Sequence, residues 1–551
     1  MPKPRALRRS LGLILLLGLL PLAVWLGWAR TAFLGLSNPD ALDIAQTARH
    51  LAEGDGFVTS AITPLTLGLV PRVEGHPVLL QAPLFTFYEA LWFRVGGARP
   101  ILAAAATGLL WLLSLWLTFA CARRLFSHRA ALFALLLFLT SAPLLRFSIS
   151  GLPHLLAAAT VTGLLMVLIR AGGGHPGRPT WGLPAAAGVL AGLACLTDHA
   201  LTWMVVVPAL LFWVRAPRQA DAAAAPSHQA GRRAGLIFVV ALALCLAPWM
   251  ARNARVVGNP FWTPDRYELL VRTDEYPGQS VFRRLPGNIH GPLAFVVDHP
   301  LQTARKVARG LGELGETLPS VPGMVVLALF LAGCLRPPRD AAGRVQRYFL
   351  TMMLLGAGFH CLASQQFDRL LAFTPGMVLF ASAAACRLVD ELAERQATGR
   401  LAWARPLVPL AAVWLLTTAP LVSAWARTRA VPPVLPTAGA VHLAREMGQQ
   451  EAVVTDAPWL IAWYVGRPAV WLPQEEKEFN KLVQNTRSLS WLYFSRYGQW
   501  IEPLEMGRWW RQAVVSRGGY GPFERQDAQA PREVILRRSA TAAGTTPSSG
   551  H

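Results

Sequence analysis

Residues 100–147 read PILAAAATGLLWLLSLWLTFACARRLFSHRAALFALLLFLTSAPLLRF, two long apolar runs separated by a short basic turn. Each run, at 100–121 and 129–147, has about the 20 residues that a helix needs to cross a bilayer. The turn from Arg123 to Arg129 is rich in arginine, which is typical of loops that stay on the cytoplasmic side. This stretch therefore predicts a helical hairpin in a membrane.

The composition extends this prediction to the whole chain. Of the 551 residues, 53% are hydrophobic and 15% are charged, whereas soluble domains carry about 25% charged residues. The net charge of +21 comes from arginines that lie mostly in short loops between apolar runs and not on one soluble face. We therefore expect a polytopic α-helical membrane protein with no nucleic-acid partner.

Basic loops recur in every second connection between apolar runs. We expect about eleven transmembrane helices, at 10–29, 100–121, 129–147, 154–170, 182–197, 200–214, 235–250, 321–335, 347–363, 370–387 and 405–424. This alternation places the N-terminus in the cytoplasm and the C-terminal tail outside an inner (plasma) membrane. Residues 78–96 would invert the alternation if they crossed, so we interpret them as a juxtamembrane helix in the membrane interface.

The topology divides the chain into three parts. Residues 1–429 form the transmembrane domain, which includes two long external loops at 30–98 and 251–320. Residues 430–540 alternate short strands and helices, which predicts a small external α/β domain. Residues 541–551 predict a disordered tail. The six cysteines lie in or beside apolar runs without metal-binding spacing, so they predict neither a disulfide framework nor a zinc site.

The first external loop offers acidic residues at a helix start. Asn38 or Asp40 can cap a helix predicted over 41–53, whose apolar residues recur at a spacing of 3.6. The bare pattern favours Asp40 as a helix cap alone, and Asp43, one turn on, as a solvated acid. The alternative for Asp40 is a functional carboxylate beside the membrane.

Tight external turns add further ionisable residues. Asp198 and His199 interrupt an apolar hairpin, where a charge is retained only if water, a partner or a ligand meets it. His154 follows a similar turn and fits a structural role equally well. Arg369 lies beside Asp368, which fits either a local ion pair or a cation that faces a ligand.

Several segments occur in the order found in one family of membrane enzymes. PDALDIAQTARHLAEGDGF (39–57) has an aspartate followed by a helix ending in Ala-Arg-x-Leu, and HPVLLQAPLFTFYEALWFRVGG (76–97) follows it. LAPWMARNARVVGNPF (246–261) carries Pro-Trp, Arg-Asn and Gly-x-Pro-Phe, and VVTDAPWLIAWYVGRPAVWLP (453–473) opens the tail. Over about residues 10–475 the chain resembles bacterial members of the GT-C superfamily of polyprenyl-phosphate-sugar-dependent glycosyltransferases, such as protein O-mannosyltransferases and lipid A aminoarabinose transferases.

The resemblance implies a GT-C-like fold and transfer of a sugar from a polyprenyl-phosphate donor to an acceptor lipid, glycan or protein on the external face. Asp40 takes the position of the catalytic aspartate. It is the candidate general base, or the candidate ligand of a divalent metal, which some members use and others do not. The substrate-binding candidates are Asp43, His76, His154, Asp198, His199, Arg252, Asn253 and Arg369.

Two turns depart from the family pattern. The turn 151–154 lacks the acidic residue that usually precedes the proline, and the turn 198–199 replaces a usual Lys or Arg that would face the lipid phosphate. His199, Arg252 or Arg369 is expected to supply the cation, and we expect Arg369 to share a cavity with Asp40.

The departures keep two other hypotheses open. One is a non-catalytic GT-C-like protein that binds polyprenyl lipids. The other is a transporter or flippase of lipid-linked saccharides, although the spans lack the ionisable midplane residues and inverted repeats that such proteins often carry.

Overall fold

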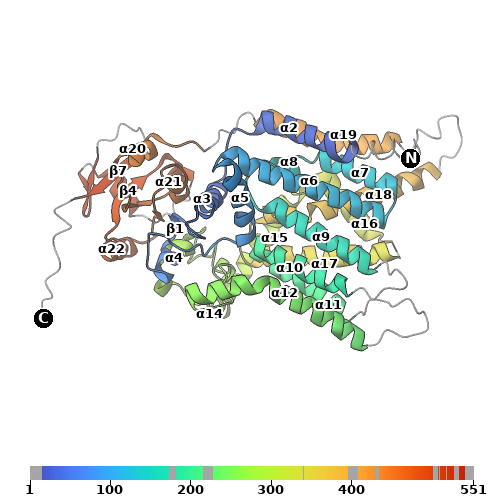
Figure 1. Cartoon of the computed structure of the whole chain (residues 1–551), viewed down its shortest axis with the longest axis horizontal. Coiled ribbons are helices and arrows are strands. Elements are labelled where there is room, and N and C mark those ends of the chain that lie inside the picture. The colour runs from blue at the N-terminus through green and yellow to red at the C-terminus, as the bar shows by residue number, and fades with distance from the viewer. Residues whose placement is uncertain are drawn as a thin grey trace.

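The computed structural model describes residues 15–172, 181–214, 228–338, 340–394, 407–428, 434–500, 507, 509–516, 518–526 and 533–539. Among these residues, a body of packed helices occupies one end of the longest axis and a seven-stranded sheet with its helices the other (Figure 1). The described chain is thus mostly helical with a small C-terminal sheet. The predicted disordered tail, 541–551, lies outside the described residues.

Several helices of the body begin at a side chain that accepts a hydrogen bond from a first-turn backbone N–H, or at a proline, which has no N–H. Ser127 accepts a hydrogen bond from the Ala130 N–H at 3.1 Å, and Asp340 accepts one from the Ala342 N–H at 2.9 Å, as N-caps do. The elements are η1 (Leu15–Leu19), α2 (Leu20–Ala32), α6 (Pro100–Leu125), α7 (His128–Leu139), α8 (Ala142–Phe147), α9 (His154–Gly172), α10 (Gly182–Thr197), η2 (His199–Val205), α11 (Val206–Val214), α12 (His228–Val257), α16 (Met324–Leu335), α17 (Ala341–Leu362), η6 (Phe367–Phe373), α18 (Thr374–Glu394) and α19 (Leu407–Thr428).

Four helices in the described ranges are long and apolar enough to cross a membrane, or five if one bent pair is a single span. They are Pro100–Leu125, His154–Ala171, Gly231–Val257 and Phe367–Glu391, and the bent pair is Pro300–Ser320 with Met324–Leu335. The pair bends by 108° next to Gly323, whose φ of 93° is one that glycine adopts readily. Several other apolar helices have 10–17 residues, so the expected number of about eleven stays a prediction.

Two predicted spans are broken in the structure. The run 129–147 divides into α7 and α8, because α7 ends at Leu139 and Pro143 opens α8 without a backbone N–H. The run 200–214 starts as the 3₁₀ helix η2 and continues as α11. The Asp198 side chain accepts a hydrogen bond from the Ala200 N–H at 3.0 Å and so begins the second arm of this hairpin.

The helix predicted over 41–53 is confirmed as α3 (Pro39–Glu53). Its cap is Asn38, whose side chain accepts a hydrogen bond from the Asp40 N–H at 2.8 Å. The interpretation of Asp40 as a cap is therefore wrong, because Asn38 already fills that position.

The juxtamembrane segment forms a helix only from Pro83 onward, as α5 (Pro83–Gly96, 14 residues). A helix of this length extends about 21 Å, less than the roughly 30 Å of a bilayer core. That this segment does not cross the membrane stays a prediction. It packs against α3, α6 and α10.

The sheet has the strand order β1-β3-β2-β4-β7-β6-β5. Neighbours from β1 to β4 pair in parallel, and β7, β6 and β5 pair antiparallel. The strands are β1 (Ala61–Ile62), β2 (Ala452–Thr455), β3 (Ala469–Trp471), β4 (Leu489–Phe494), β5 (Gly519–Tyr520), β6 (Phe523–Arg525) and β7 (Val534–Arg538), with helices α20 (Ala438–Glu446), α21 (Pro458–Tyr464), α22 (Glu476–Asn485), η7 (Arg496–Trp500) and α24 (Trp510–Val515). The sequence predicted β2, β3, β4 and β7.

The first long loop, residues 30–98, is attached to the C-terminal sheet. Strand β1 belongs to that loop and pairs with β3, with Ala61 opposite Ala469. The Arg49 guanidinium donates hydrogen bonds to the carbonyls of Trp463 at 2.9 Å and Ala462 at 2.7 Å and stacks over the Trp463 ring. These contacts hold α3 against α21, where the two parts of the molecule meet (Figure 1).

The second long loop, residues 251–320, consists of helical elements that dock on the same region. They are α13 (Asp265–Glu268), η3 (Ser280–Arg283), η4 (Pro286–Asn288), α14 (Pro292–Asp298), α15 (Pro300–Thr317) and η5 (Leu318–Ser320), next to α4 (Pro64–Leu69) of the first loop. Buried Arg283 donates a hydrogen bond to the Leu472 carbonyl of the tail at 2.7 Å. Lys306 of α15 donates to the Glu268 carbonyl at 2.7 Å, which fixes α13.

Candidate active site

A cavity of about 1240 Å³ lies where the two long loops (30–98 and 251–320), the ends of several body helices and the C-terminal sheet meet. Apolar residues such as Phe85, Leu152 and Trp459 form part of its wall, and ionisable side chains form another part. Six of the nine predicted site residues line it: Asp40, Asp43, His154, Asp198, His199 and Arg369. They come from four separate segments of the chain, which the fold brings together as expected for Asp40 and Arg369.

Asp40 stands in the first turn of α3 with its side chain exposed to the cavity. Its backbone N–H donates to the Asn38 side chain in the helix cap. Among the described residues, no hydrogen bond holds its carboxylate. Desolvation of the Asp40 carboxyl group by the residues around it raises its pKa, and the positive charge of Arg369 only partly offsets this effect. Asp40 is thus a free carboxyl group whose basicity is increased.

Asp43 is not the solvated acid that the sequence suggested. One carboxylate oxygen accepts a hydrogen bond from Gln46 Nε2 at 3.0 Å, and the other accepts one from Gln81 Nε2 at 2.6 Å. Burial nevertheless raises the pKa of Asp43 to about 6, since the two amide donors offset only part of the desolvation. The side chain ties α3 to the segment that precedes α5.

Arg369 is the centre of a group of carboxylates. Its Nη1 lies 3.2 Å from Asp198 Oδ1, and its Nη2 lies 3.7 Å from Glu268 Oε1. Only the backbone N–H of Arg369 binds Asp368, at 3.1 Å. The expected alternative of a local Asp368–Arg369 side-chain pair is therefore wrong, because the guanidinium turns toward Asp198 and the second loop.

The charges around Arg369 affect the acids differently. Burial opposes ionisation of Asp198, but the charge of Arg369, together with His360, the Ala200 N–H and His199, outweighs it and holds the pKa of Asp198 below its usual range. Burial raises the pKa of Asp265 and of Glu268 to about 7, although Arg369 acts in the opposite direction on both. Near neutral pH the cavity therefore contains both ionised and protonated carboxyl groups.

The two cavity histidines have different surroundings. His154 Nε2 lies 3.3 Å from Asp368 Oδ2, and its ring packs on Phe147 with centroids 4.4 Å apart. His199 opens η2 directly after Asp198 and lines the cavity. His154 and Arg369 both interact electrostatically with Asp40, so the predicted site forms one charged network.

Three predicted residues do not line this cavity. His76 is buried, and its Nδ1 contacts the Arg72 carbonyl at 2.8 Å; burial lowers the pKa of His76 to about 4. Buried Asn253 donates to the Trp262 carbonyl at 3.1 Å, and Arg252 stacks over the Trp249 ring at 4.7 Å. Local contacts use Nδ1 of His76, the Asn253 amide and the face of the Arg252 guanidinium, and a role of these three in substrate binding stays a prediction.

The cavity also contains acids that sequence reasoning missed. Asp265 and Glu268 come from α13, a four-residue helix in the second loop. Asp456 comes from the end of β2, where it accepts a hydrogen bond from the Ser495 N–H at 2.9 Å. An acid at the end of a predicted strand was a usable signal for Asp456. No comparable signal marks α13, because its place depends on Lys306 and on contacts between loops.

Within the described ranges, two groups of His, Asp and Glu are close enough to share a metal ion. One contains Glu275, His290 and His299, and the other His50, Glu53 and Asp55. Asp40 belongs to neither group, and its role as a metal ligand stays a prediction.

No family model matches the sequence, and no curated protein matches it either. Solved structures do match. ArnT from Cupriavidus metallidurans in the apo state is 15% identical, with a TM-score of 0.58 over 98% of this chain and 100% of that one. The same protein bound to undecaprenyl phosphate has a TM-score of 0.56 at 15% identity, covering 97% and 99%.

A second matching protein is the archaeal oligosaccharyltransferase AglB from Archaeoglobus fulgidus, in complex with an inhibitory peptide and a dolichol-phosphate. It is 12% identical, with a TM-score of 0.57 over 87% of this chain and 69% of that one. At such identities the likeness concerns the fold. The chain therefore has the fold that ArnT and AglB share.

Proposed function

We propose that this chain is a glycosyltransferase that moves a sugar from a polyprenyl-phosphate donor to an acceptor on the external face of the bacterial inner membrane. The observation that supports this most is the cavity in which Asp40, with its free carboxyl group, and Arg369 face the same space. The fold adds support, since one matching structure is bound to undecaprenyl phosphate and another contains a dolichol-phosphate.

In this proposal Asp40 is the general base. It takes a proton from the acceptor nucleophile as that group attacks the anomeric carbon, while the bond from this carbon to the phosphate oxygen breaks. A base whose pKa is raised toward the working pH removes a proton more effectively than an ordinary aspartate. The lack of a protein hydrogen bond to the carboxylate leaves its lone pairs free for the acceptor.

Arg369 meets the phosphate that leaves with the lipid. Two of its nitrogens face Asp198 and Glu268, and its guanidinium has five N–H donors in all. The raised pKa of Glu268 and Asp265 reduces the negative charge that would repel a phosphate. A protonated carboxyl group can also donate a hydrogen bond to a phosphate oxygen. The cluster can therefore accept an anion although its residues are mostly acidic.

A second candidate is a non-catalytic protein that binds polyprenyl lipids with the same cavity. The specific observation in its favour is that the carboxyl groups of Asp198 and Glu268 already lie next to two nitrogens of Arg369. In addition, the turn 198–199 lacks the Lys or Arg that the family pattern predicts. Both candidates bind the lipid phosphate, and only the first breaks the sugar–phosphate bond.

The two candidates are separated by offering purified protein a panel of polyprenyl-phosphate sugars together with a membrane extract as the acceptor source. Release of free polyprenyl phosphate is the product common to every acceptor, so it is the quantity to measure. The glycosyltransferase proposal expects release from at least one donor. Lipid binding without release supports the second candidate, and absence of both binding and release contradicts the two.

A further inference from the structure

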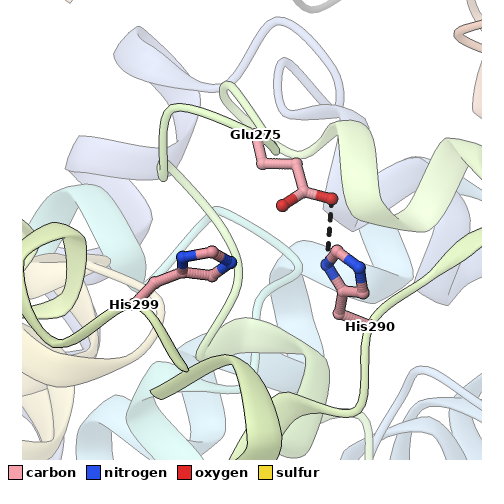
Figure 2. A group of neighbouring side chains, drawn as sticks. All are labelled: Glu275, His290 and His299. Atoms are coloured by element: carbon pink, nitrogen blue, oxygen red, sulfur yellow. Dashed lines mark ion pairs between the residues drawn. The ribbon is translucent and has the colours of Figure 1, made fainter. Parts of the chain in front are cut away.

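The second external loop brings together three side chains that are separated in sequence. Glu275 precedes η3, His290 lies between η4 and α14, and His299 precedes α15; their side chains converge on one space (Figure 2). One ligand atom from each residue lies within 4.8 Å of the others. Glu275 Oε1 and His290 Nδ1 are 3.1 Å apart. None of the three lines the candidate active-site cavity.

A small apolar core fixes the backbone that carries these side chains. Tyr276, next to Glu275, is buried, and its hydroxyl accepts a hydrogen bond from the His290 N–H at 3.1 Å. The buried ring of Phe295 lies 6.1 Å from Tyr276 and 4.7 Å from His299, measured between centroids. The three side chains are therefore positioned by packing and not by one another alone, as a preformed ligand site requires.

An ordinary ion pair explains only part of this arrangement. It accounts for Glu275 and His290, but it does not explain why His299 faces the same space. Among the described residues, no hydrogen bond holds the His299 ring, which contacts its neighbours only through ring faces and edges. A cation that accepts one lone pair from each residue would explain all three orientations.

The set of ligands indicates which cation fits. Two imidazoles with one carboxylate suit Zn²⁺ and similar transition metals, whereas Ca²⁺ and Mg²⁺ prefer oxygen ligands. Three protein ligands leave a position for water, and the exposed His290 side chain keeps one side of the group open to solvent.

The other group of potential ligands fits a metal poorly. His50 Nδ1 contacts Asp55 Oδ2 at 2.9 Å, and its Nε2 contacts the Ser60 hydroxyl at 2.9 Å. Both ring nitrogens are therefore occupied by protein partners. This difference makes His50 a suitable control for the group in the second loop.

We propose that Glu275, His290 and His299 bind one divalent transition-metal ion, with Zn²⁺ as the preferred occupant. The ion joins three points of the second loop and so stabilises the segment between α13 and α15. Lys306 of α15 holds the carbonyl of Glu268, which connects this site mechanically to the cavity wall. The ion takes no part in the transfer reaction, and the site does not depend on the proposed function.

The test uses the full chain, purified in detergent without a polyhistidine tag and treated with a chelator. Bound zinc is counted by elemental analysis after dialysis against Zn²⁺, and affinity is measured by competition with a chromophoric chelator. We expect the wild type to bind one zinc ion. His290→Ala, His299→Ala and Glu275→Gln should each lower the zinc affinity at least about tenfold. His50→Ala should retain the wild-type affinity.

Because the His290 side chain is 60% exposed, its alanine variant should fold like the wild type, which size-exclusion chromatography can verify. The absence of stoichiometric zinc would overturn the proposal. The proposal would also be overturned if His290→Ala and His299→Ala bound zinc as tightly as the wild type. The same holds if His50→Ala lowered the zinc affinity to the same extent as those variants. Sugar transfer is not measured in this test, so its outcome is independent of the glycosyltransferase proposal.

Discussion

At the scale of single residues, Asp43 makes stability depend on pH. Its pKa is raised by burial to about 6 in the folded chain, against about 3.9 in an unfolded one. The unfolded state therefore loses its proton first, so stability falls as the pH rises from about 4 to about 6. The contribution is fully present below the unfolded pKa and amounts to at most about 3 kcal/mol.

We expect Asp43→Asn to remove this part of the pH dependence. The Gln81 Oε1 atom is buried without a hydrogen-bond partner, so a rotated Gln81 amide can accept a hydrogen bond from the amide group that the substitution introduces. The thermal unfolding midpoint of the wild type should decline between pH 4 and pH 6.5, and that of the variant should decline less. Identical slopes would mean that Asp43 has no raised pKa.

Arg369 allows its structural and ligand-binding roles to be separated. Removing one partner of a buried ion pair costs about 3–5 kcal/mol, and less here because the Arg369 side chain is 25% exposed. Arg369→Gln should therefore lower the unfolding midpoint and weaken binding of a fluorescent polyprenyl phosphate. Adding Asp198→Asn removes the unpaired carboxylate, so the double variant should recover stability but not lipid binding. Recovery of both would leave Arg369 with a structural role alone.

The sequence could identify single residues where a family motif or a helix start marked them. Asp40 was found in this way, and Asp198 and Arg369 were singled out as charges in tight turns between apolar runs. His76 was not distinguishable from a ligand, because its carbonyl partner depends on the folding of the loop. The environment of Asp43 was also missed, since Gln81 is 38 residues away and no local pattern indicates their contact.

At the scale of elements, the attachment of α3 to α21 depends on Arg49. Its two hydrogen bonds reach adjacent carbonyls, a geometry that the single ammonium group of lysine cannot reproduce. We expect Arg49→Lys to speed amide hydrogen exchange in α21 and β3 at least severalfold, because a hydrogen bond from a charged group contributes about 1.5–3 kcal/mol. Exposed Arg445→Lys on α20 is the matched control and should leave exchange unchanged. Equal exchange in both variants would contradict this role.

Elements with a strong hydrophobic pattern were predictable, and those that depend on a partner were not. The strands β2, β3, β4 and β7 and the helix α3 followed from alternation and from 3.6-residue periodicity. Strand β1 has two residues and exists only because β3 pairs with it. The break between α7 and α8 was missed because the hydropathy of the run 129–147 stays high across it.

At the scale of the whole molecule, the arginine pattern predicts one orientation in the membrane. A reporter fused after Arg124 should be cytoplasmic, and reporters fused after Gly75 and after Gln450 should be external. An external reporter at Arg124 would mean that residues 78–96 cross the membrane. In that case the external loops would no longer share one side, and the cavity could not face the outside.

The overall fold was predictable from the order of the motifs, although the sequence matches no family model. The resemblance covers most of the chain, and its solved counterparts share the fold at 12–15% identity. Such divergence preserves the arrangement of helices while side chains in loops change. For this reason the carboxylates of α13 could not be foreseen.

The most direct test of the central claim compares the wild type with Asp40→Asn in the release of polyprenyl phosphate from a donor that the wild type uses. Asn38 caps α3 and no described residue bonds the Asp40 carboxylate, so the variant should fold normally. Asp55→Asn, an exposed acid of the same loop, is the control. If Asp40 is the general base, its variant should be slower by about 10²–10⁴-fold, while Asp55→Asn keeps its rate. Wild-type release by Asp40→Asn would contradict the account.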